Sequence, residues 1–250
     1  FINNRIKDNS IRFINSVIEN IDIRNSYPFI TANNLNLEIK NSTFSNFYSD
    51  SGYIFEIINS YNHLNVIIND STFKNTSSIL TGKYLNTKIS NVIFKDIAST
   101  QSIPAFSNAV SSSFKIENSM FYNLILSKGL FNEESSYDLN NIKFNNITSN
   151  SKALLYFVYS DVKMNIVEFN DITCIGDRGD SSFILYDSSE NDVNMEINNL
   201  IGKNSQSNGP FIKIIGDSAS IIINNSYINN IKSYGSIIDI FSNKVTIKLL

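Results

Sequence analysis

The sequence predicts an all-β solenoid, and three observations lead to that fold class. A short motif recurs along the whole chain, a second apolar run lies between successive copies, and Asn, Ile and Ser dominate the composition. Asn and Ile each make up roughly a sixth of the residues, whereas an ordinary globular domain is led by Leu, Ala and Gly. Amide and hydroxyl side chains stack well but promote helices poorly, so this composition favours stacked strands.

The motif is clearest as LEIKNSTFSNF at residues 37–47. Its copies follow one another at intervals of roughly 21 to 33 residues, with a mean near 26, which is the range of solenoid repeats. The copy at 193–203 is degenerate, and FINN at residues 1–4 resembles the tail of one more. The copies occupy residues 11–21, 37–47, 66–76, 87–97, 114–124, 137–147, 162–172, 193–203 and 221–231.

The second apolar run is introduced in most periods by Gly, Ser or Lys and is followed by a polar loop. Both runs have strand-like patterns, and no stretch of helical spacing is long enough to compete. At about 3.3 Å per residue, one period closes a coil of two or three strands, not a βαβ unit with its crossover helix. The second runs occupy residues 27–30, 52–58, 77–81, 103–110, 128–131, 152–159, 181–187, 209–215 and 235–241.

Coils stacked about 4.8 Å apart pair every strand with its copies above and below, so like residues form ladders along the axis. Strict alternation predicts that the first Asn of the motif points into the core, where each amide is satisfied by its neighbour and by the bending backbone. The predicted Asn ladder comprises Asn15, Asn41, Asn91, Asn118, Asn141 and Asn225, with Asp70 standing in once. The predicted aromatic stack of the core comprises Phe44, Phe73, Phe94, Phe121, Phe144 and Phe169.

This motif, written apolar-x-apolar-x-Asn-Ser-x-Phe-x-Asn-apolar, resembles that of the right-handed parallel β-helix repeat proteins and covers nearly the whole chain. The Asn, Ile and Ser bias without Trp more narrowly resembles the β-helical repeat regions of cellulosome scaffoldins from anaerobic gut fungi. We therefore expect one domain over residues 1–250, a single right-handed parallel β-helix of about nine to ten coils. A β-sandwich with coincidentally similar strands is the alternative. The opening Phe1 and the strand-like VTIKLL at the end predict a piece of a longer repeat protein with both ends cut.

The charge argues against two classes of partner. A net charge of -3 and only 17% charged residues give no basic footprint for nucleic acid or for an anionic membrane. No apolar run approaches the length that spans a bilayer. The one cysteine, Cys174, cannot form an internal disulfide, and we expect it to be a buried structural thiol.

Few residues offer catalytic chemistry. His63 is the one histidine and lies in a polar loop, so we expect an ordinary surface residue. The β-helix polygalacturonases carry N-T-D, D-D, G-H-G and R-I-K on successive coils, and of these only R-I-K occurs, at residues 5–7. Pectate lyases need carboxylates that converge on calcium and an arginine, and here only Arg178 sits beside acids. We therefore expect no catalytic residue and no cofactor.

The segment 176–192, GDRGDSSFILYDSSEND, carries the densest set of charged side chains. Asp177, Asp180 and Asp187 could hold calcium if turns bring their carboxylates together, and Glu190 and Asp192 follow them. They could equally be solvated turn residues, which Gly and Asp favour. Within the segment, residues 178–180 spell the Arg-Gly-Asp triplet of integrin ligands, for which a tight turn is the alternative explanation.

Sequons mark possible N-glycosylation sites at Asn69, Asn75, Asn146 and Asn224. About seven sequons are expected by chance from the composition, so their presence is no evidence of secretion. A further sequon, at Asn41, belongs to the predicted internal ladder and is a poor acceptor.

Tyrosines are the available platforms for sugars, because the chain has no Trp. We expect Tyr48 and Tyr122 to face outward, and Tyr53, Tyr156 and Tyr234 to pack in the core. These residues do not form a sugar-binding row.

The repeat predicts a non-enzymatic extracellular scaffold, a stiff rod that spaces binding sites for other proteins. Each coil repeats nearly the same surface, and loops of variable length at 99–113 and 174–182 interrupt it. The scaffoldin resemblance implies that the parent chain gathers dockerin-bearing enzymes into a plant-cell-wall-degrading complex, although no family binding motif matches, so no contact residue is carried over. The alternatives are a surface adhesin that uses the 176–192 segment and a calcium-dependent β-helix polysaccharide lyase.

Overall fold

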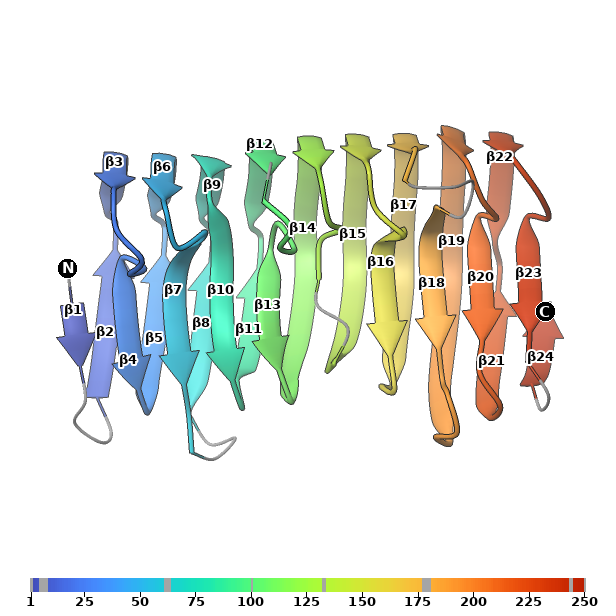
Figure 1. Ribbon diagram of the computed structural model, residues 1–250, viewed down its shortest axis with the longest axis horizontal. Helices are drawn as coiled ribbons and strands as arrows, with labels where there is room; N and C mark the ends of the chain where they lie inside the picture. The colour runs from blue at the N-terminus through green and yellow to red at the C-terminus, as the bar shows by residue number, and fades with distance from the viewer. Residues whose placement is uncertain are drawn as a thin grey trace.

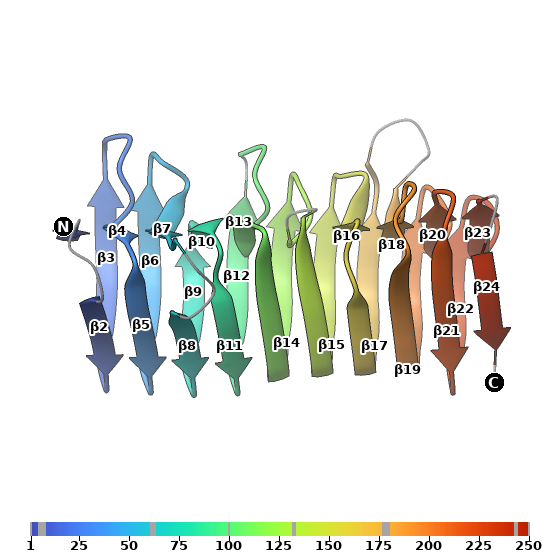
Figure 2. The ribbon, with the colours of Figure 1, turned by 90° about the horizontal axis from the view of Figure 1, so that it is seen from below.

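The computed structural model describes residues 2–4, 9–60, 64–99, 101–131, 134–176, 181–242 and 245–249. Over these residues the chain forms 24 β-strands and no helix. The strands wind into one elongated solenoid with the two termini at opposite ends (Figure 1). In Figure 1 the chain advances from left to right. In each coil it runs upward at the back, comes forward at the top and runs downward at the front, so the coil is right-handed (Figures 1 and 2). The predicted all-β parallel β-helix is therefore confirmed.

Each coil has three strand segments, and we call the three stacks of segments face 1, face 2 and face 3. Face 1 consists of β2 (Asn9–Ile14), β5 (Leu35–Lys40), β8 (Asn65–Asn69), β11 (Asn86–Ser90), the first parts of β14 (Ser112–Leu126), β15 (Ser135–Ser149), β17 (Val162–Cys174) and β19 (Val193–Ser207), and then β21 (Ala219–Asn224) and β24 (Val245–Leu249). Face 2 consists of β3 (Val17–Ile23), β6 (Thr43–Ser49), β9 (Thr72–Thr76), β12 (Ile93–Ser99), the second parts of β14, β15, β17 and β19, and β22 (Tyr227–Ser233).

Face 3 is split into a five-stranded and a four-stranded sheet. The first contains β1 (Ile2–Asn4), β4 (Ile30–Asn33), β7 (Tyr53–Ile58), β10 (Ser78–Lys83) and β13 (Ser107–Val110). The second contains β16 (Ala153–Val158), β18 (Ser182–Asp187), β20 (Ile212–Ile215) and β23 (Ile238–Phe241). Between them one coil contributes an isolated parallel bridge from Phe131 to Ser107.

We number the coils from 1, which contains β2, β3 and β4, to 9, which contains β21, β22 and β23. Every strand pair is parallel, and each residue is paired with its counterpart one coil away, as Phe44 is with Phe73. Successive coils are offset by as little as 21 residues and by as much as 33, around a period near 26. The solenoid has about nine turns, close to the predicted nine to ten.

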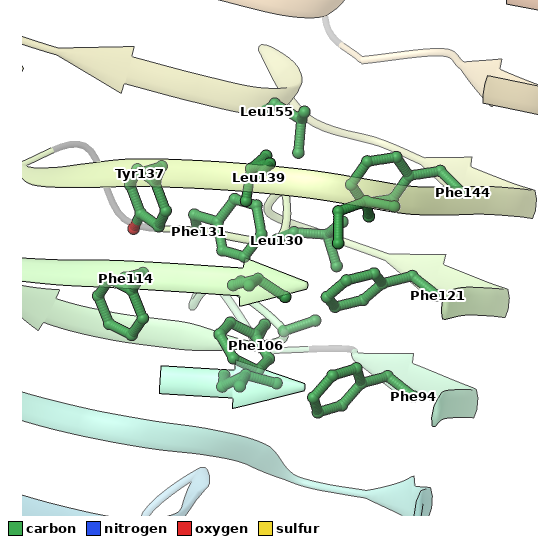
Figure 3. Packing of buried hydrophobic residues seen from close by; sticks show 14 of the residues in the cluster. Phe94, Phe106, Phe114, Phe121, Leu130, Phe131, Tyr137, Leu139, Phe144 and Leu155 are labelled. Atoms are coloured by element: carbon green, nitrogen blue, oxygen red, sulfur yellow. The ribbon is translucent and has the colours of Figure 1, made fainter. Parts of the chain in front are cut away.

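The core is organised around a phenylalanine stack on the inner side of face 2. The rings of Phe44, Phe73, Phe94, Phe121, Phe144 and Phe169 stack with centroids 4.7 to 5.4 Å apart. Side chains of face 3 meet this stack edge-on, as Phe106 meets Phe94 at 81° and Phe131 meets Phe121 at 87° (Figure 3). Offset and edge-on contacts are the arrangements that the ring quadrupole favours.

The prediction that the motif asparagines point into the core is wrong. At the first corner, where face 1 turns into face 2, one residue of every coil has a positive φ between 47° and 58°. These residues are Asn15, Asn41, Asp70, Asn91, Asn118, Asn141, Ile166, Asn199 and Asn225. Asn tolerates this left-handed conformation better than most residues, which explains its recurrence. The bend shifts the inward and outward alternation by one residue, so Asn41 is exposed and Ser42 after it is buried.

Serine, not asparagine, is the polar residue inside this corner. The Ser42 hydroxyl donates to the Lys40 carbonyl at 2.8 Å and accepts from the Ser16 amide at 3.1 Å. Ser71 and Ser119 make the equivalent contacts: each donates to the carbonyl two residues earlier and accepts from an amide of the preceding coil. Each buried hydroxyl is thus satisfied, and it pairs an amide that the bend removes from the strand ladder.

Candidate functional site

The outer side of face 2 carries two parallel rows of polar side chains. The first row is the first corner, and the second lies five positions later in each coil, again with positive φ. The second row comprises Asn20, Asn46, Asn75, Asp96, Asn123, Asn146, Asp171, Asn204 and Asn230. Neighbouring amides are hydrogen bonded along the axis: Asn41 Nδ2 donates to Asn15 Oδ1 at 2.8 Å, and Asn75 Nδ2 to Asn46 Oδ1 at 3.0 Å. These rows give face 2 an ordered, hydrogen-bonding surface in which Asp70, Asp96 and Asp171 are the charged members.

The rows have a direction, because the donor belongs to the later coil in each of these bonds. An aspartate can accept from the coil after it but has no N–H for the coil before it. Asp96 accepts from Asn123 at 3.0 Å, and among the described residues no hydrogen bond joins it to Asn75. Asp70 accepts from Asn91 in the same way at 2.9 Å. At each aspartate, the asparagine one coil earlier therefore has an amide oxygen that receives no hydrogen bond from the row.

A notch interrupts the second corner, where face 2 turns into face 3. In coil 3 this corner is the single residue Ser77 between β9 and β10, whereas in coil 4 β12 ends at Ser99 and β13 begins only at Ser107, and coil 1 uses residues 24–29. Figure 2 shows the connections after β6 and β12 rising on either side of the short turn from β9 to β10. The cavity at this place has a volume of about 530 Å³, and we call it the notch.

The far wall of the notch is the coil 4 connection, which leans back over coil 3. The Ser78 hydroxyl donates to the Pro104 carbonyl at 2.8 Å, and the Ser78 amide donates to the Gly52 carbonyl at 2.9 Å. A Cβ on Gly52 would collide with the side chains of Gln101 and Ile103, and its φ of 85° also requires glycine. Gly52 therefore allows the connection to close over the shorter corner.

The near wall of the notch is built around Tyr48, which is 45% exposed. The Arg24 guanidinium lies 4.8 Å from the centre of the ring and its Nε is 2.7 Å from Asp22 Oδ1. The hydrogen bond and the charge of Asp22 raise the pKa of Arg24 above its ordinary value. Arg24 and Asp22 both belong to coil 1, so the cation covers one side of the ring, and its charge is balanced locally.

The calcium candidates are only partly placed. Asp177 and Asp180 lie outside the described residues, as does the whole triplet 178–180. Asp187 is half-buried at the end of β18, and its Oδ1 accepts from the Ser189 amide at 2.9 Å. Within the described ranges no three His, Cys, Asp or Glu side chains gather in a group that could hold a metal ion.

Of the two residues with base or nucleophile chemistry, His63 and Cys174, the structure describes only Cys174. His63 and the triplet at residues 5–7 fall outside the described residues. Cys174 is buried at the end of β17, and burial raises the pKa of its thiol well above the ordinary value. A protonated, enclosed thiol has neither the charge nor the access of a nucleophile.

The sequon asparagines Asn69, Asn75, Asn146 and Asn224 all make side-chain hydrogen bonds with an adjacent coil. Asn75 and Asn146 belong to the second row, and each Nδ2 donates to the preceding coil. Asn224 Nδ2 donates to Asn198 at 2.7 Å, and Asn69 accepts from the Ser90 hydroxyl at 2.8 Å. Glycosylation at Asn75, Asn146 or Asn224 would modify a nitrogen that the fold already uses.

The tyrosines follow the expectations in part. Tyr48 is exposed, and half-buried Tyr122 carries the Lys95 amine 5.7 Å from the centre of its ring. Tyr53 is half-buried on face 3, where its hydroxyl accepts from Asn108 at 2.8 Å. The expectation that Tyr234 packs in the core is wrong, because it lies in the loop after β22 and is 82% exposed.

The notch is the feature that sequence reasoning missed. Its signal was present in the coil lengths, since coil 3 is the shortest: Asn91 of coil 4 follows Asp70 of coil 3 by only 21 residues. The repeat unit alone does not show which corner has lost residues. Only the strand bounds show that the second corner is the short one.

Comparison with other proteins adds no assignment. No protein-family model, no curated protein and no solved structure matches this chain. In the part of the chain that the structure describes, no helix is both long and apolar enough to cross a membrane.

Proposed function

We propose that this chain is a non-catalytic extracellular scaffold, a rigid rod whose outer faces bind other proteins. The observation that supports this most is the outer side of face 2, where the same two positions are polar in every coil except at Ile166. A surface held by hydrogen bonds along the axis offers equivalent positions at fixed spacing, which favours multivalent binding. The proposal that the chain is non-catalytic rests on its scarcity of side chains with acid–base or nucleophile chemistry, with one histidine and one buried, protonated thiol.

An apolar strip on face 2 supports a protein partner. Ile93 of coil 4 is paired with Met120 of coil 5, and Ala98 with Ile125, which is 64% exposed. Asp96 and Asn123 of the second row lie between these two pairs. Non-obligate protein interfaces likewise combine apolar and polar side chains.

Dockerin modules are the partner class that the scaffoldin resemblance implies. The test is calorimetric titration of this chain with a panel of fungal dockerins, using wild type, Ile125→Asp and the control Ile175→Asp. Ile175 is 46% exposed but lies in the second corner of coil 7, away from the strip. We expect binding that Ile125→Asp weakens about tenfold or more and that Ile175→Asp leaves unchanged.

Two results would contradict the proposal. The first is the absence of dockerin binding together with specific binding to a host-cell receptor, which would favour the adhesin. The second is turnover of polygalacturonate, pectate, xylan or cellulose, measured with and without calcium, which would favour the lyase.

A further inference from the structure

We propose that the notch at the second corner of coil 3 binds a neutral oligosaccharide, with one sugar ring packed on Tyr48. The notch shares Ala98 with the apolar strip, but its proposed ligand is a sugar and does not depend on a protein partner. Four properties of the notch lead to this ligand class: its size, its charge, the open face of Tyr48 and an acceptor that lacks a donor.

The size and charge of the notch suit a short, uncharged chain. A volume of about 530 Å³ lies within the range of small-molecule sites. Its charged residues are Arg24 and Asp22, which neutralise each other in a 2.7 Å ion pair. Most of the remaining polar lining consists of amides and hydroxyls, including Asn46, Asn75 and Gln101. An anionic ligand would find no unpaired cation here, whereas sugar hydroxyls find both donors and acceptors.

Tyr48 offers one ring face to a ligand. Arg24 occupies the side toward coil 1. On the other side, the equivalent outward positions of coils 3 and 4 are Ser77 and Ala98, which are too small to cover the ring. A pyranose packs its C–H face on an aromatic ring in such a position.

Asn75 provides an acceptor that the fold leaves open. Its Nδ2 donates to Asn46, but the next coil has Asp96 at the ladder position, and a carboxylate cannot donate to Asn75 Oδ1. A ligand hydroxyl at the notch can supply the missing proton donor. The missing hydrogen bond between Asn75 and Asp96 thus lies beside the notch, which is also lined by Asn46 of the same row.

The test is calorimetric titration of this chain with cellohexaose, xylohexaose, mannohexaose and chitohexaose, and with hexagalacturonate as the anionic probe. We expect at least one neutral oligosaccharide to bind. Tyr48→Ala should weaken that binding about tenfold, the loss of one ring contact. Ala98→Phe should abolish it by filling the space beside the ring. Tyr227→Ala, which removes a ring of similar exposure in coil 9, should change it less than about twofold.

A second pair of variants tests the acceptor without altering the lining. Asp96→Asn restores the donor to Asn75 Oδ1 and should weaken binding severalfold. The matched change Asp171→Asn in coil 7 supplies the equivalent missing donor to Asn146 of coil 6 and should leave binding unchanged.

The proposal is overturned if no neutral oligosaccharide binds at millimolar concentration, or if only hexagalacturonate binds. It is also overturned if Ala98→Phe binds like wild type or if Tyr227→Ala loses as much affinity as Tyr48→Ala. Dockerin binding is measured with different ligands and variants, so failure of either proposal is visible separately.

Discussion

The two corners that bound face 2 differ in how much they vary. The first corner is one left-handed residue in every coil, and β14, β15, β17 and β19 run through it as continuous strands. The second corner ranges from Ser77 alone in coil 3 to the longer connection of coil 4, where β12 ends at Ser99 and β13 begins at Ser107. Register is therefore maintained at the first corner, and part of the variation in coil length is taken up at the second. Stability is expected to depend on the first corner and face 2, and specificity on the second corner.

The largest effect is expected inside face 2. Phe121→Ala removes a ring that stacks on Phe94 at 4.7 Å and on Phe144 at 5.2 Å, so it should lower the free energy of unfolding by about 3–5 kcal/mol. Denaturant titration followed by circular dichroism measures the change. Ile125→Ala, on the outer side of the same strand, is the control and should cost less than about 0.5 kcal/mol. Equal losses would show that the stack is not the source of the stability.

At the first corner, the conformation of the backbone should matter more than the ladder bond. Asn118 has a φ of 49°, which a β-branched residue adopts only with strain, so Asn118→Val should cost about 1–2 kcal/mol. Asn118→Gly keeps the backbone and loses the bond from Asn141, and should cost less. A larger loss for glycine than for valine in the same denaturation experiment would refute the argument from strain.

Ile166 is the exception in the first row, and its replacement should stabilise the protein. Its φ is 55° and its side chain is 47% exposed, so isoleucine adds strain there without burial. Ile166→Asn should raise the free energy of unfolding by about 1 kcal/mol, read as a higher melting temperature. Ile166→Val retains the β-branch and should show no gain. A higher melting temperature in both variants would show that relief of backbone strain is not the cause.

Repair of the second row should give a smaller gain. Asp96→Asn provides the N–H that Asn75 Oδ1 lacks and should add about 0.5–1 kcal/mol, the net value of one hydrogen bond. Thermal unfolding with Glu19→Gln as the control, which removes an exposed carboxylate from face 2 opposite Ser45 without closing a ladder of this kind, separates the bond from the charge. Equal gains in the two variants would assign the effect to charge alone.

The smallest effect is expected at the second corner. Insertion of Gly-Ser after Tyr234, which is 82% exposed, should change the free energy of unfolding by less than about 0.5 kcal/mol. The same insertion after Asn118, within β14, should destabilise the protein clearly because it displaces the strand that follows. Similar melting temperatures for the two insertions would contradict the division between the corners.

The sequence was informative where structure is local and repeated. The period, the parallel coil and the inward position of Phe44 and its counterparts follow from alternation within each strand. The same reasoning misplaced Asn41, because a single left-handed residue reverses the alternation and periodicity does not show its φ. The outward position of Tyr48 could be predicted, but not its open ring face, which depends on small residues in two later coils. A repeat motif describes what coils share, whereas the notch arises from how adjacent coils differ.

Stacking the coils in parallel also determines how the rod responds to force. The bonds between coils run along the axis, so tension on the two ends loads the outermost coil first, as in a zipper. Each coil that peels away releases a period near 26 residues, which is on the order of 90 Å of extended chain. Under load the rod would therefore lengthen in discrete steps, one coil at a time, and the coils still wound would keep their surfaces intact.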